Sequence, residues 1–211
     1  YHAQDAFQGQ LHTIENTPFR TKFEHDLSDF HGCSGIGCIS DTDPQPLLVR
    51  SHLGLYAITT VGIINNAEEL VAQYFSDHGH QFMAMSSGKV NSTELAAALI
   101  NQADDLVSGI RHAQAKIDGS CTMLLLTADG IIAARDALGR LPVLVGQGED
   151  GCCVSFESFA YHKLGYHDAY ELGPGEIVKV TPTGWETLSP AGDKMRICAF
   201  LWTYYGYPNS N

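Results

Sequence analysis

The sequence predicts an α+β fold of antiparallel sheets packed with helices, and two observations support this class. Segments with helical signals, at residues 65–79, 91–102 and 103–117, lie between two runs of strand-like segments. Strands and helices grouped in this way along a chain are typical of α+β domains. The apolar run MLLLT at residues 123–127 indicates a strand buried on both faces, as in a sheet sandwiched between helices. No repeat or linker divides residues 1–211, so we expect a single domain.

Strand signals occur before and after the helical segments. The first expected strands are residues 34–40, 47–51 and 55–61. The later ones are residues 121–127, 131–136, 142–146, 152–156, 176–180 and 185–188, with a short helix at 158–164. Residues 128–130 read Ala-Asp-Gly, an Asp-Gly hairpin signal between two of these strands.

Terminal signals support the first two long helices. Asn66 is expected to cap the first helix, with Glu69 three residues later as in a capping box, and Gly79 to end it. Asn91 or Ser92 is expected to cap the second helix.

The charge balance limits the classes of partner. Lys and Arg total 12 against 24 Asp and Glu, which gives a net charge of −12. Phosphate backbones and anionic lipid surfaces require clustered positive charge, so neither nucleic acid nor a membrane is the expected main partner. No apolar run approaches the roughly 20 residues of a membrane helix. The opening YHAQDAFQGQ does not resemble a signal peptide, and a cytoplasmic protein is expected.

The six cysteines do not form a regular framework, and free thiols in a reducing cytoplasm are expected. His31, Cys33 and Cys38 offer a zinc alternative, but no second pair lies at the spacing of a zinc finger. His78 and His80 are interpreted as solvated loop residues rather than ligands. We therefore expect neither a metal nor a cofactor.

Seven segments occur in an order that identifies a family. They are PQPLLVRS, NNAEEL, STELAAALI, DGSCTMLLLTADGIIAARDALGRLPVLVG, VSFESFA, ELGPGEIVKV and CAFLWTYYGYPNS. Together they resemble the class II glutamine amidotransferase domain of amidophosphoribosyltransferases, whose fold is the four-layer αββα sandwich of N-terminal-nucleophile hydrolases. The segments IENTPFRTKFEHDL and IGCISDTDPQPLLVRSHLG resemble a divergent branch of that family more closely.

The resemblance also implies segments outside the sequence. The first strand of such a domain is expected upstream of Tyr1, and a phosphoribosyltransferase domain is expected downstream, since no phosphoribosyl pyrophosphate motif occurs in residues 1–211.

The resemblance implies four requirements for glutamine hydrolysis. An N-terminal Cys attacks the side-chain amide, and its α-amine, with a reference pKa of about 7.7–8.0, acts as the base. An Asn side chain and a Gly backbone N–H stabilise the oxyanion. An Arg binds the glutamine α-carboxylate, and an Asp receives the α-ammonium.

This sequence departs from the family at most of those positions. Position 1 is Tyr1, and Cys33 is internal, so no nucleophile is assigned. In register with the family strand, Ser40 occupies the Arg position and Cys38 the neighbouring His position, and a structural thiol is the favoured interpretation of both cysteines. Ser92 occupies the Asp position.

The oxyanion motif HNGN becomes TVGI at residues 60–63. Thr60 and Val61 therefore replace His and Asn, while Gly62 is kept. Loss of one oxyanion donor costs about 10²–10³ in rate. Each lost charge-assisted bond forfeits roughly a further 1.5–3 kcal/mol.

The positions that match the family are interpreted as structural. They are Gly62, Asp136, Gly139, Pro142, Glu157, Ser158, Pro174, Gly175 and Glu176. Among these we expect one turn at residues 136–139, a type II turn at 174–175 and a helix cap at 157–158. Tyr204, Tyr205 and Tyr207 are expected to be core or interface aromatics.

The sequence thus predicts a degenerate glutaminase-type domain of an amidophosphoribosyltransferase-like, purine-biosynthesis protein. Its parent would use ammonia or no amide donor, and the domain would act as a scaffold, a regulator or the binder of a small molecule in the vestigial site, as part of a homo-oligomer. One alternative is an active amidotransferase whose Cys lies upstream of Tyr1. The other is a stand-alone, non-catalytic interaction module.

Overall fold

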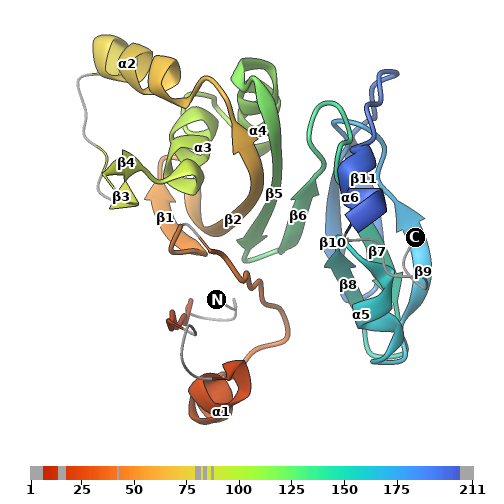
Figure 1. The fold of residues 1–211 in the computed structure, drawn as a ribbon. Helices are drawn as coiled ribbons and strands as arrows, with labels where there is room; N and C mark the ends of the chain where they lie inside the picture. Colours follow the sequence, from red (N-terminus) through yellow and green to blue (C-terminus); the bar gives the residue numbers. More distant parts are fainter. Residues whose placement is uncertain are drawn as a thin grey trace.

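Two long antiparallel strands form the centre of the fold in the computed structural model, which describes residues 7–13, 18–41, 43–78, 82, 85–86 and 88–204. They belong to a six-stranded sheet of order β1-β2-β5-β6-β10-β11 (Figure 1). Its strands are β1 Leu47–Ser51, β2 Gly54–Ile64, β5 Gly119–Thr127, β6 Gly130–Ala134, β10 Ile177–Thr181 and β11 Gly184–Ser189. Every pairing in this sheet is antiparallel.

One face of the six-stranded sheet packs against helices. These are α2 Ala67–His78, α3 Ser92–Ile100 and α4 Leu106–Lys116. Leu95 and Ile100 of α3 pack with Ile110 of α4 over Met123 and Leu125 of β5, and all five side chains are buried. This is the larger apolar core of the protein.

The opposite face of the same sheet packs against a second sheet. This sheet has the order β8-β7-β9 and consists of β7 Leu144–Gln147, β8 Cys152–Ser155 and β9 His167–Glu171. Val143 and Val145 pack there against Val178 and Val180 of β10. The short helix α5, Ser158–His162, packs on the second sheet, so the layers run helix, sheet, sheet, helix.

The layer order confirms the predicted α+β sandwich, with one difference around β5. Met123 and Leu125 face the helices, whereas Leu124 packs towards the second sheet. The run MLLLT is therefore covered on both faces, but by helices on one side and by a sheet on the other.

The remaining elements lie at the periphery. They are α1 Phe19–Asp29, β3 Met85–Ser86, β4 Lys89–Val90 and α6 Ala199–Tyr204. Helix α1 has no buried residue and lies apart from the sheets in Figure 1. The sequence analysis missed these four elements and β9. Among the described residues, no helix is long and apolar enough to cross a membrane.

The predicted helix signals have different outcomes. Asn91 caps α3, accepting from the N–H groups of Thr93 at 2.8 Å and Glu94 at 3.2 Å, as expected. Asn66 directly precedes α2, but its carboxamide accepts from Asp118 N–H at 2.9 Å and donates to the Lys116 carbonyl at 3.0 Å, which ties α2 to the end of α4.

Three local predictions differ from the structure. Residues 34–40 form no strand apart from a single bridge at Gly35, and Ile39 is 71% exposed, because no described segment pairs with them along their length. Glu157 occupies the N-cap position of α5 without a side-chain cap bond, and Ser158 is the first helical residue. The third long helix begins at Leu106, where Asp105 is the cap, rather than at residue 103.

Gly79, His80, Tyr205 and Tyr207, and the side chains of His78 and Tyr204, lie outside what the structure describes. The predictions for them stay predictions.

Candidate functional site

Three of the predicted site residues, Ser40, Thr60 and Ser92, lie where the C-terminal half of β2 passes the start of α3. Thr60 of β2 and Thr93 of α3 are both buried, and their hydroxyl oxygens lie 2.7 Å apart. Gln45, which precedes β1, holds the two elements together. Its Oε1 accepts from Thr59 Oγ1 at 2.7 Å, from Thr60 N–H at 2.8 Å and from Thr93 Oγ1 at 3.1 Å.

A second set of contacts joins Ser40 and Ser92 to the same place. Asp43 Oδ2 accepts from the backbone N–H of Ser92 at 3.1 Å, and the Asp43 N–H donates to Ser40 Oγ at 3.1 Å. Asn91, which is fully buried, donates to the Pro44 carbonyl at 3.1 Å. Asp43, Pro44 and Gln45 are thus hydrogen-bonded to Ser92, Asn91 and Thr93, respectively.

We name the residues joined by these bonds the β2–α3 corner. It comprises Ser40, Asp43, Pro44, Gln45, Thr59, Thr60, Asn91, Ser92 and Thr93. Asp43 is its one ionisable group, and the sequence analysis did not select either Asp43 or Gln45.

Val61 and Gly62 continue β2 beyond the corner, opposite Thr122 and Cys121 of β5. Because side chains alternate along a strand, Val61 faces away from the helices and Thr60 faces towards them. Val61 offers no hydrogen-bond donor in its side chain.

Gly62 is required by the backbone. Its φ is +147°, a value that L side chains rarely adopt, and a Cβ there would lie 2.0 Å from the Ser120 carbonyl oxygen. This close approach of β5 explains the glycine without any role in chemistry.

Cys121, the thiol next to the corner, is a poor nucleophile. Cys121 lies opposite Gly62 but points into the helix-side core, where burial, with a smaller contribution from the Asp136 carboxylate, raises its pKa to about 12. Such a thiol stays protonated near neutral pH, and only the thiolate is strongly nucleophilic. In the described part of the chain, no basic side chain is hydrogen-bonded to Cys33 or Cys38.

All six cysteines are free, as expected. Among the residues that the structure describes, no three His, Cys, Asp or Glu side chains are grouped so that they could hold a metal ion. His31, Cys33 and Cys38 therefore do not form such a group.

The buried charges of the fold lie in a different region, around Arg135 at the end of β6. The guanidinium, 3% exposed, donates to the carbonyls of Gly139 at 3.0 Å, Leu141 at 2.7 Å and Leu172, and pairs with Glu171 Oε1 at 3.0 Å. We name Arg135, Asp136, Gly139 and their hydrogen-bonding partners the Arg135 hub.

The turns of this region agree with the sequence analysis. The Asp136 carboxylate accepts from the N–H groups of Leu138 at 3.1 Å and Arg140 at 2.7 Å, and Gly139 has a φ of +63°. In the other turn, Gly175 has a φ of +68° and Glu176 N–H donates to the Gly173 carbonyl, as a type II turn requires.

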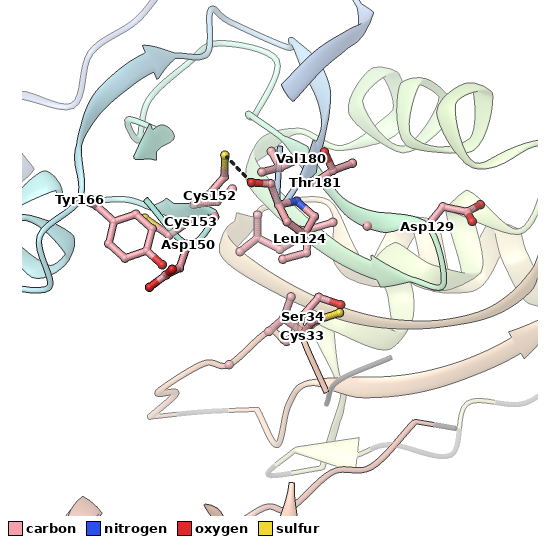
Figure 2. Close-up of a pocket in the computed structure, with 18 of the residues that line it drawn as sticks. Cys33, Ser34, Leu124, Asp129, Asp150, Cys152, Cys153, Tyr166, Val180 and Thr181 are labelled. Carbon is pink, nitrogen blue, oxygen red and sulfur yellow. Dashed lines mark hydrogen bonds between the residues drawn. The ribbon is translucent and has the colours of Figure 1, made fainter. Parts of the chain in front are cut away.

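A pocket of about 360 Å³ lies elsewhere, between β8 and residues 33–37 (Figure 2). Leu124 and Val180 line it from the inner face of the six-stranded sheet, and Asp150 and Tyr166 lie on the β8 side. None of the predicted site residues lines this pocket.

The layered architecture defines a class of protein, the αββα sandwich of the N-terminal-nucleophile type. Residues 35–160 match the model of a family described as a glutamine amidotransferase domain. The chain belongs to this family, and its relatives place it with the amidophosphoribosyltransferases.

The amidophosphoribosyltransferase of Archaeoglobus fulgidus is 29% identical over 167 residues, 79% of this chain and 36% of the relative. That of Rattus norvegicus is 26% identical over 188 residues, with the same two coverages. The chain therefore spans about a third of the length of these relatives.

Two solved structures of such enzymes also resemble this chain in fold. Glutamine phosphoribosylpyrophosphate amidotransferase from B. subtilis, complexed with ADP and GMP, has a TM-score of 0.69 at 28% identity and covers 80% of this chain and 37% of its own. A structure described as the allosteric regulatory enzyme of purine biosynthesis has a TM-score of 0.67 at 28% identity, with 79% and 36% covered.

Proposed function

We propose that this amidotransferase domain no longer hydrolyses glutamine and serves as a scaffold or regulatory part of an amidophosphoribosyltransferase-like polypeptide of purine biosynthesis that uses ammonia. The observation that carries the proposal is the chemistry of the β2–α3 corner. Its threonine hydroxyls bond to one another and to Gln45, and the next side chain along β2, that of Val61, cannot donate to an oxyanion.

The retained glycine does not argue against the proposal. Gly62 is demanded by the approach of the Ser120 carbonyl, so its presence is expected whether or not an oxyanion forms beside it. Cys121, the thiol opposite Gly62, is held neutral by burial. The same proposal includes three further features: a vestigial pocket for another small molecule, a homo-oligomeric state and a downstream phosphoribosyltransferase domain.

The test supplies the complete protein with phosphoribosyl pyrophosphate and either glutamine or ammonium chloride. We expect product with ammonia only, and no covalent labelling by a diazo-ketone analogue of glutamine. Ammonia release from glutamine, together with a labelled N-terminal Cys, would overturn the proposal.

One contact favours a second candidate, an active glutaminase with a relocated contact. Asp43 places a carboxylate 3.1 Å from the backbone nitrogen of Ser92, next to the position where the family motif has its ammonium-binding Asp. If this candidate is right, Asp43→Asn lowers kcat/KM for glutamine by at least about tenfold while leaving the ammonia reaction unchanged. Under the leading proposal, there is no glutamine reaction for this substitution to lower.

A further inference from the structure

Helix α5 depends on the sheet against which it packs for its stability. It has five residues, and Glu157 at its N-cap makes no side-chain cap bond. Isolated helices shorter than about 12–15 residues are at best marginally stable in water. The position of α5 is therefore set by its contacts with β7, β8 and β9 (Figure 1).

Two adjacent side chains of α5 bond to one carboxylate oxygen of β9. The Tyr161 O–H donates to Asp168 Oδ1 at 2.5 Å, and His162 Nε2 lies 2.9 Å from the same oxygen. The Tyr161 carbonyl also accepts from the N–H groups of Leu164 at 3.0 Å and Tyr166 at 3.1 Å, in the loop that leads to β9. We name Tyr161, His162 and Asp168 the Asp168 cluster.

The two donors of the cluster respond differently to pH. Tyr161 is 3% exposed, and a Cβ added at Gly146 of β7 would lie 2.9 Å from its ring. Burial, followed by the hydrogen bond to Asp168, raises the pKa of Tyr161, so the phenol stays protonated at physiological pH. His162 is 39% exposed, and histidine is the side chain that ordinarily changes charge between about pH 5 and pH 8. Only the bond from His162 therefore changes in strength across this range.

The groups around the cluster leave His162 as the side chain whose charge acts most directly. The hydrogen bond from Tyr161 lowers the pKa of Asp168, so this carboxylate is charged throughout the histidine range. The other titratable or charged groups beside the cluster are His167 of β9, Cys153 of β8 and Lys163 of α5. Among the described residues, only Tyr161 and His162 donate hydrogen bonds to the Asp168 carboxylate.

We propose that the Asp168 cluster makes the attachment of α5 to the three-stranded sheet dependent on pH. The attachment is tightest between about pH 5 and pH 6, where protonated His162 forms an ion pair with Asp168. It weakens towards about pH 8, where a neutral His162 offers at most an uncharged hydrogen bond. The inference is independent of the proposed function, because no residue of the β2–α3 corner takes part.

The test measures amide hydrogen exchange by mass spectrometry in the complete protein, at about pH 5.5 and about pH 7.5. The reporters are residues 164–166, whose N–H groups bond to carbonyls of α5. After division by the intrinsic exchange rate at each pH, their protection is expected to be about two- to fivefold lower at the higher pH, as for an exposed ion pair. Amides of β5, in the other sheet, are the internal reference and are expected to keep their protection.

Three variants assign the effect to its residues. His162→Gln keeps a hydrogen-bond donor but cannot gain a charge, so the pH dependence at residues 164–166 is expected to disappear. Asp168→Asn removes the carboxylate and is expected to abolish it as well. His167→Gln is the matched control, because His167 adjoins Asp168 in sequence without a hydrogen bond to it, and this variant is expected to keep the effect.

Three results would overturn the proposal. The first is an equal fall in protection in His162→Gln and in the native sequence. The second is a fall that is lost in His167→Gln but kept in His162→Gln, which would assign the pH dependence to the other histidine. The third is an equal fall at residues 164–166 and in β5, which would show a change in the stability of the whole domain rather than in the attachment of α5.

Discussion

The β2–α3 corner and the Arg135 hub are both buried polar regions, but they use different chemistry. The corner consists of neutral groups apart from Asp43, and Gln45 joins its strands and helix. The hub consists of a buried cation and carboxylate whose bonds go mainly to backbone groups of turns. The charged groups of the hub are hydrogen-bonded to backbone groups, whereas the corner contains one charged side chain, that of Asp43. The buried charges of the hub therefore stabilise the turns around them.

The largest expected effect comes from removing the hub's cation. Arg135→Met leaves the carbonyls of Gly139, Leu141 and Leu172 without their donor, and we expect a loss of about 3–5 kcal/mol in the free energy of unfolding. Urea denaturation measures it. Arg50→Met, an exposed arginine on β1, is the control and is expected to change stability by less than about 0.5 kcal/mol. Similar losses in both variants would contradict the structural role of the hub.

The second prediction concerns the glycine that adjoins the corner. Gly62→Ala combines an unfavourable φ with a collision against Ser120, and we expect a loss of about 2–4 kcal/mol. Gly184 is a matched control, because its φ of +146° is nearly the same but nothing lies within 4 Å of an added Cβ. If Gly184→Ala destabilises the protein as much as Gly62→Ala, close approach of β5 is not what fixes Gly62.

A smaller effect is expected inside the corner. Thr60→Val removes the bond between the two threonine hydroxyls, while Thr93 keeps its bond to Gln45, so the expected loss is about 1 kcal/mol. Thr21→Val, at an exposed position of α1, is the control and is expected to be close to neutral. A double-mutant cycle with Thr93→Val measures the coupling. No coupling would show that the corner is not one network.

The smallest effect is expected from a charge at the surface, which sharpens the contrast with the hub. The hydrogen bond from Tyr161 O–H at 2.5 Å, followed by that from His162, lowers the pKa of Asp168. A lowered pKa gives stability that is complete above the unfolded-chain pKa and is lost as pH falls through the folded one. Asp168 is 43% exposed, so this loss is smaller than the other three effects.

The measurement for Asp168 is the free energy of unfolding between about pH 5 and pH 2 in the native sequence and in Tyr161→Phe. The variant is expected to lose less stability on acidification, because its Asp168 has one hydrogen bond fewer. Parallel curves would show that Tyr161 does not hold the Asp168 carboxylate.

The sequence predicted the features that depend on neighbouring residues. The Asn91 cap, the hairpin at residues 128–130 and the turn at Pro174-Gly175 have signals a few residues long, and the structure contains each of them. Helix α1 was missed because Pro18 precedes it without a side-chain cap and no acidic residue lies in its first turn. Strand β9, HDAYE, was missed because it has no run of large apolar residues.

The candidate site was predictable only in part. Thr60, Ser40 and Ser92 are joined through Asp43, Gln45 and Thr93. Asp43 and Gln45 were not selected, because their partners in α3 lie about 50 residues away in sequence, and the turn signal DTDPQP gave no indication of them. Only the folded arrangement shows that this turn joins the three predicted positions.

The approach of β5 to Gly62 has a consequence for how such chains evolve and are recognised. A catalytic residue that is no longer needed for the reaction can be replaced by other residue types. A glycine in contact with a neighbouring carbonyl cannot, because any side chain would collide with that carbonyl. A lineage that abandons the reaction therefore keeps this glycine for as long as it keeps the sheet. Motif searches that count it as evidence of activity will then go on grouping inactive descendants with working enzymes.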